Sequence, residues 1–117
     1  IYTLSLHDAL PILVIVEQYV GAYVRLIELV RKQYGPVPVI CIRPHSAGAY
    51  LSASFKVLQQ RLSAHKDVHF AEFMPGIITV EKDLGASYHP NYSGQQKLCM
   101  TLVPLMSAVM GWEINEK

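Results

Sequence analysis

Residues Val37 to Ile42 read V-P-V-I-C-I, an almost unbroken apolar run that is typical of a strand covered on both faces of a parallel sheet. Pro38 lacks a backbone donor and therefore belongs at the beginning of that strand. A second run of β-branched and aromatic residues follows at Val68 to Phe73. The residues between the two runs have a helical pattern, so the sequence predicts a βαβ unit with adjacent, parallel strands.

Three helices are predicted around these strands, near residues 14 to 34, 49 to 64 and 94 to 110, because apolar residues recur there at three- and four-residue steps. Gly35 and Pro36 should end the first helix, since glycine tolerates a left-handed conformation and proline cannot continue a helix. The order helix, strand, helix, strand, long loop, helix is that of the C-terminal half of a doubly wound sheet. The predicted fold class is therefore α/β.

The last helix carries three further signals. Ser93 and Gln96 have the spacing of a capping box, which predicts that the helix begins at Ser93. Pro104 predicts a kink, because it removes a backbone donor and clashes with the preceding turn. A second apolar row predicts deep packing of this helix, and consists of Cys99, Val103, Met106 and Met110.

Composition limits the class of protein. At 117 residues the chain is one domain or part of one. Because 51% of its residues are apolar and only 16% are charged, the composition argues against disorder. Ten Lys and Arg residues are scattered and nearly balanced by nine acids, so no nucleic-acid partner is expected. No apolar run approaches the ~20 residues that span a bilayer, so no membrane partner is expected either. Two cysteines and scattered histidines indicate no metal or other cofactor, and the oligomeric state stays open.

The beginning of the chain is unusual. Residues Ile1 to Ile12 read I-Y-T-L-S-L-H-D-A-L-P-I and look like translated sequencing-adapter read-through, so we exclude them from the fold and expect them to be poorly integrated. A genuine apolar lead-in is the alternative, because Leu10 to Val16 could form a buried strand or the start of a helix. Under the first interpretation, residues 13 to 117 form the native part of the chain.

The segment with the clearest chemical character is Asp83 to Gly94, D-L-G-A-S-Y-H-P-N-Y-S-G, within a long loop. Pro90 restricts its own φ and pushes His89 toward an extended conformation, so the imidazole sits on a stiff support. A long loop in a compact domain is usually functional. Histidine is the side chain best suited to accept and return a proton near neutral pH.

This segment resembles the last sequence block of the SGNH (GDSL-like) serine esterases, closest to the acetylxylan-type branch that deacetylates carbohydrates. In that branch a histidine-proline pair precedes the final helix, and Ser93 to Lys97 and Gly111-Trp112 are similar to its closing helix and end. The resemblance implies a flavodoxin-like sheet, an O-acetyl or similar short acyl ester of a carbohydrate as substrate, and His89 as general base and acid. It also implies a C-terminal fragment that is inactive alone, because the block with the nucleophilic serine is absent.

The chain departs from that family in the acid that orients the histidine. The family places an aspartate three or two residues before the histidine, where this chain has Ala86 and Ser87. A backbone carbonyl near Tyr88, the Ser87 hydroxyl, or Asp83 folding back could take that role. Asp83 is the weakest of these candidates, because a turn at Gly85 must close its six-residue separation from His89. Turn formation is the alternative role of Asp83.

Substrate contacts are expected where the strands end, because ligands of doubly wound sheets lie beyond the carboxyl ends of the strands. Arg43 and His45 lie on the loop after the first strand, and could contact substrate or be solvated. Tyr88 could stack on a sugar ring or cover the core. A noncatalytic carbohydrate-binding or interaction domain with the same fold is the alternative function, and the sequence upstream of residue 13 would distinguish the two.

Overall fold

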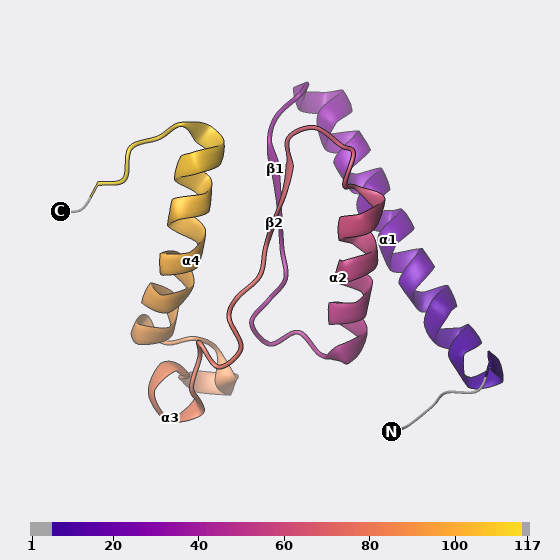
Figure 1. Cartoon of the computed structure of the whole chain (residues 1–117). Coiled ribbons are helices and arrows are strands. Elements are labelled where there is room, and N and C mark those ends of the chain that lie inside the picture. Colours follow the sequence, from indigo (N-terminus) through magenta and orange to yellow (C-terminus); the bar gives the residue numbers. More distant parts are fainter. Residues whose placement is uncertain (1–5, 116–117) are drawn as a thin grey trace. The chain divides into compact units, whose positions relative to one another are not determined.

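The computed structural model describes residues 6–115, which divide into two compact units, 6–39 with 47–68 and 40–46 with 69–115. Helices and strands alternate along most of the chain (Figure 1). The elements in order are α1 (Leu6–Tyr34), β1 (Val39–Ile42), α2 (Ala49–Arg61), β2 (Val68–Ala71), α3 (Val80–Asp83), the 3-10 turn η1 (Ala86–Tyr88) and α4 (Tyr92–Met110). The structure thus contains both helix and strand, in agreement with the predicted α/β class.

The two strands form a parallel sheet in which β1 and β2 are neighbours, as the sequence predicts. The Val39 amide donates to the Asp67 carbonyl at 2.9 Å, just before β2, and the Arg43 amide donates to the Ala71 carbonyl at 3.0 Å, at its end. Because the strands are parallel, their carboxyl ends meet at one edge. The loops that carry Arg43 and Glu72 therefore leave the sheet side by side.

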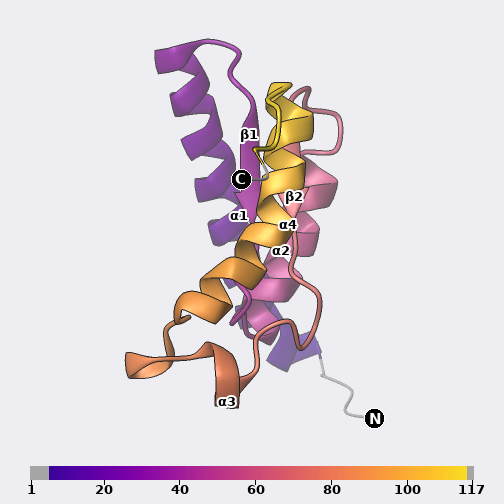
Figure 2. The same cartoon turned by 90° about the vertical axis from the view of Figure 1, so that its left-hand side faces the viewer.

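In the first unit α1 packs against α2 (Figures 1 and 2). The apolar stripes predicted for these helices supply the buried side chains, among them Val20 and Ile27 of α1 and Phe55 and Leu58 of α2. The predicted end of α1 is confirmed, since Gly35 has a φ of +79° and its amide donates to the Arg31 carbonyl at 2.8 Å.

The beginning of α1 differs from the prediction. The helix starts at Leu6 rather than near residue 14, and Pro11 lies inside it. A proline this close to the helix start removes a single backbone hydrogen bond, and the residues around it carry no other helix breaker. Residues 1–5 of the excluded segment lie outside the described residues, whereas residues 6–12 belong to α1.

Two predictions for α4 are wrong. The N-cap is Asn91, whose side chain accepts from the Gly94 amide at 3.0 Å, because the Ser93 hydroxyl is bonded elsewhere. The second apolar row is exposed at Cys99, Val103, Met106 and Met110, because no other helix or strand of the second unit, as far as the structure describes it, covers this face. The helix runs through Pro104, and the kink stays a prediction. No helix within residues 6–115 is long and apolar enough to cross a membrane.

Candidate functional site

A cavity of about 400 Å³ lies in the second unit, at the carboxyl ends of the strands. Its polar lining comes from the loop after β1 and from the histidine loop, and includes Arg43, His45, Ser46 and Tyr88. Its apolar lining comes mostly from the segment after β2, and includes Phe73, Met74, Ile77, Ile78 and Leu84. The structure therefore brings the three residues expected to contact substrate, Arg43, His45 and Tyr88, to one cavity.

The apolar wall is the part of this cavity that the sequence analysis missed. Met74 is exposed, whereas Phe73, two residues after β2, is buried. The Ile77 amide donates to the Met74 carbonyl at 3.1 Å, so the Pro75-Gly76 turn folds the segment back beside the strand end. The sequence predicted a turn at Pro75-Gly76. It did not predict that this turn would place Ile77 and Ile78 in the wall of the cavity.

Arg43 is held at the rim of the cavity by contacts between the two strand ends. Its Nε donates to Glu72 Oε1 at 3.2 Å, and its amide is bonded to Ala71 at the end of β2. Because Glu72 directly follows β2, this pair ties together the two loops that leave the sheet. The ion pair with Glu72 fixes the position of the Arg43 guanidinium at the cavity.

His89 lies on a tightly closed loop. Its backbone is extended, with φ −76° and ψ 146°, as expected for a residue before proline. The Gly85 amide donates to the His89 carbonyl at 2.7 Å, and the His89 amide donates to the Ala86 carbonyl at 3.1 Å. An antiparallel bridge between Leu84 and Pro90 closes the base of the loop. His89 is exposed, and although Tyr88 before it in the chain lines the cavity, His89 itself is not one of the lining residues.

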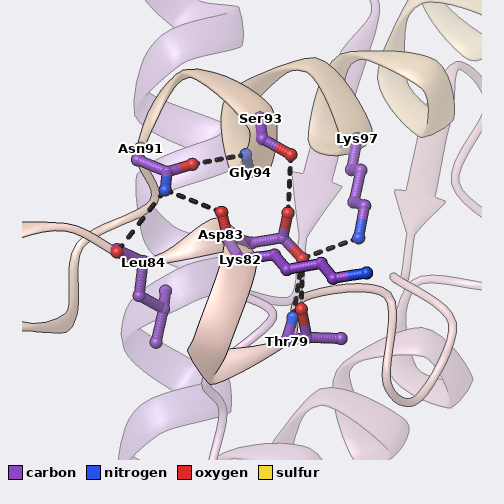
Figure 3. Close-up of polar contacts among 8 residues, drawn as sticks. All are labelled: Thr79, Lys82, Asp83, Leu84, Asn91, Ser93, Gly94 and Lys97. Carbon is purple, nitrogen blue, oxygen red and sulfur yellow. Dashed lines mark hydrogen bonds and ion pairs between the residues drawn. The ribbon is translucent and has the colours of Figure 1, made fainter.

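Asp83 is fully buried at the end of α3, where its carboxylate accepts four hydrogen bonds (Figure 3). The Thr79 amide and hydroxyl donate to Oδ2 at 2.8 and 3.0 Å, and the Ser93 hydroxyl donates to Oδ1 at 2.7 Å. The Lys97 ammonium lies 2.6 Å from Oδ2. We call Asp83, Thr79, Ser93 and Lys97 the Asp83 cluster.

The Asp83 cluster changes the interpretation of Asp83. Within residues 6–115, the hydrogen bonds of the Asp83 carboxylate go to Thr79, Ser93 and Lys97 and none goes to His89. Turn formation, the other interpretation of Asp83, agrees with the two bonds from Thr79 in the same turn. The bonds to α4 were missed, because their partners lie ten and fourteen residues further along the chain.

The charge of this buried carboxylate is stabilised by its partners. The Lys97 ammonium, followed by the Thr79 amide and the Ser93 hydroxyl, lowers the pKa of Asp83 well below its ordinary value of 3.8, although burial opposes this. The group therefore stays ionised in the folded chain under mildly acidic conditions. It is an acceptor there and not a proton donor.

This pKa shift makes the fold sensitive to acid. Since the pKa of Asp83 is lower in the folded than in the unfolded chain, its contribution to stability is fully present above pH ~5 and is lost as the pH falls toward 2. We expect the melting temperature of the wild type to fall by roughly 5 °C more than that of Asp83→Asn over this range. Thermal unfolding followed by circular dichroism at a series of pH values measures the difference. Asp67→Asn, which changes an exposed aspartate, is the control, and equal acid dependence of Asp83→Asn and wild type would contradict the assignment.

The described residues contain no group of three or more His, Cys, Asp or Glu side chains that could hold a metal ion. Comparisons of the chain with protein-family models, with curated proteins and with solved structures found no match. The cavity, the histidine loop and the chemistry of their side chains are the features of the chain that bear on its function.

Proposed function

We propose that this chain is the C-terminal part of a doubly wound SGNH-type domain, and that the complete domain is a serine esterase that removes O-acetyl or similar short acyl groups from carbohydrates. The observation that carries the proposal is the position of His89, on a stiff loop whose neighbouring Tyr88 lines a cavity at the strand ends. The resemblance of the His89-Pro90 segment to the last block of these esterases supports it.

In this mechanism His89 acts on a serine that the upstream part of the domain supplies. The imidazole accepts the serine proton as the hydroxyl oxygen attacks the acetyl carbonyl, and returns that proton to the leaving sugar alkoxide. A water molecule then attacks the acyl-enzyme while His89 accepts its proton, and His89 returns that proton to the serine oxygen as the ester bond to serine breaks and acetate leaves. The Ser87 hydroxyl or a carbonyl of the loop orients the second ring nitrogen in this scheme.

The cavity suits a partly acylated sugar. Tyr88 offers an aromatic face against which a pyranose ring can stack, and Arg43 and His45 offer polar contacts for hydroxyl groups. The apolar wall that includes Ile77 and Ile78 can take the methyl group of an acetyl ester. Both ends of the proposed substrate would therefore find complementary surface.

A noncatalytic carbohydrate-binding domain is the second candidate. It is favoured by the Asp83 carboxylate, which is bonded to Thr79, Ser93 and Lys97 rather than to His89. Binding needs that cavity and no nucleophile. The two candidates therefore differ in whether the ester is consumed.

The test replaces Tyr88 by alanine in the complete parent protein. We expect KM for an acetylated xylo-oligosaccharide to rise by roughly fivefold, because a stacking contact contributes on the order of 1 kcal/mol. Tyr92→Ala is the matched control. The exposed fraction of Tyr92 is 80%, close to the 77% of Tyr88, but Tyr92 does not line this cavity. Acetate release measures turnover, and isothermal titration calorimetry measures binding. Binding that depends on Tyr88 without acetate release would favour the noncatalytic domain, and equal effects of the two variants would contradict both candidates.

A further inference from the structure

The backbone before His89 is strained. Ser87 and Tyr88 both adopt left-handed conformations, with φ of +54° and +60°, although neither is glycine. A left-handed conformation is uncommon for residues other than glycine, and a bulky aromatic residue adopts it less readily than serine does. Two in succession persist only where the surrounding structure over-determines the loop.

Contacts around Asn91 hold the base of the loop (Figure 3). The Asn91 amide donates to the Asp83 carbonyl at 2.8 Å, and its side-chain nitrogen donates to the carbonyls of Lys82 and Leu84 at 2.8 and 3.4 Å. Its side-chain oxygen caps α4 through the Gly94 amide. Asn91 therefore connects the end of α3 with the start of α4, which are the two ends of the histidine loop.

The Asp83 cluster joins the same two helices from the buried side. Thr79 and Asp83 belong to the α3 turn, whereas Ser93 and Lys97 belong to the first turns of α4, so the Asp83 carboxylate bridges them. The first turn of α4 lies directly against the Asp83 backbone, because a Cβ on Gly94 would be only 2.4 Å from the Asp83 carbonyl oxygen. The distance between the loop ends is thus set by several short contacts.

We infer that Asp83 is a positioning residue, which acts through Ser93 and Lys97 to hold the ends of the loop from Leu84 to Pro90 together and so maintain the left-handed conformation of Ser87 and Tyr88. This conformation determines where Tyr88 and His89 leave the backbone. The conformational role is independent of any activity. Its consequence for turnover rests on the proposed function.

Nuclear magnetic resonance on the 117-residue chain tests the conformational role. Ser93→Ala removes one hydroxyl donor from Asp83, and Asp83→Asn removes the charge that Lys97 pairs with. In both variants we expect hydrogen exchange of the Gly85 and His89 amides to accelerate by about tenfold or more. We also expect the strong intraresidue nuclear Overhauser effects between the amide proton and Hα of Ser87 and Tyr88, which report the positive φ, to weaken. Ser93→Thr keeps the hydroxyl and should retain the wild-type pattern.

The control is Ser63→Ala, which removes a hydroxyl that donates to the Gln60 carbonyl at 2.9 Å in the first unit. It should leave exchange at Gly85 and His89 unchanged. If Asp83→Asn does not fold, Ser93→Ala alone decides the test. Wild-type exchange rates and intraresidue contacts in a folded Ser93→Ala chain would overturn the inference.

The parent protein separates this inference from the proposed function. With the loop loosened in Ser93→Ala, kcat for ester hydrolysis should fall by roughly tenfold with little change in KM, and Ser93→Thr should restore it. A loosened loop with normal kcat would support the conformational role and contradict His89 as the base. An unchanged loop would overturn the positioning role whatever the kinetics show.

Discussion

His89→Ala in the complete parent protein should lower turnover of an acetyl ester by at least ~100-fold, because the variant lacks the group that accepts the serine proton and returns it to the leaving alkoxide. Since His89 is exposed and its backbone conformation is one that alanine adopts readily, we expect the fold to be retained. Steady-state kinetics on an activated acetyl ester, with circular dichroism as the check on folding, measure the effect.

The control for this variant is His65→Ala, which changes an exposed histidine in the other unit. Its turnover should equal that of the wild type. Asp83→Asn, in its folded form, should lose much less turnover than His89→Ala, because the Asp83 carboxylate is bonded to Thr79, Ser93 and Lys97 and not to His89. A folded His89→Ala protein with near-normal turnover would refute the mechanism, whereas a loss in Asp83→Asn as large as that in His89→Ala would make Asp83 the orienting acid.

Gly94→Ala should destabilise the chain by about 3 kcal/mol, or roughly 10 °C in melting temperature. The added Cβ would lie 2.4 Å from the Asp83 carbonyl oxygen and 3.0 Å from Pro90 Cβ. Neither neighbour can withdraw freely, because the Asp83 carbonyl accepts the Asn91 amide at 2.8 Å and Pro90 takes part in the bridge to Leu84. The overlap outweighs the ~1 kcal/mol by which alanine favours a helix over glycine.

Gly48→Ala is the matched control, because a Cβ at Gly48 meets no atom within 4 Å and the residue has a φ of −75°. Its melting temperature should change by only a few degrees, as expected for the loss of a glycine at a helix N-cap. Thermal unfolding of the two variants measures the difference. Equal melting temperatures would show that α4 can move away from Asp83, and would remove the basis for the close approach.

The histidine loop shows how far local rules reach. The extended backbone at His89 follows from Pro90, and is confirmed. The left-handed conformations of Ser87 and Tyr88 follow from no local rule, because both residues prefer other regions. They depend on contacts that fix the two ends of the loop. The sequence thus predicted that the loop carrying the imidazole is stiff, but it did not predict the backbone conformation of that loop.

The start and the outer face of α4 also differ from what local sequence patterns predicted. Ser93 and Gln96 matched the spacing of a capping box, but the Ser93 hydroxyl donates to Asp83 instead and Asn91 caps the helix. The apolar row that includes Met106 and Met110 predicted a packed helix, yet both side chains are exposed. Periodicity reports which residues share a helix face, and does not report whether another element covers that face.

By itself the sequence determined the alternation of helices and strands, the parallel pairing of β1 and β2, the end of α1 at Gly35 and the edge where Arg43 and the histidine loop lie, because each depends on local propensity or on the rules of βαβ connection. Only the tertiary structure decided that Asp83 is buried against Ser93 and Lys97, that Gly94 has no room for a side chain, and that Ile77 and Ile78 complete the cavity. These features depend on close approach between backbone segments that are separate in the chain. Side-chain type alone does not encode such distances.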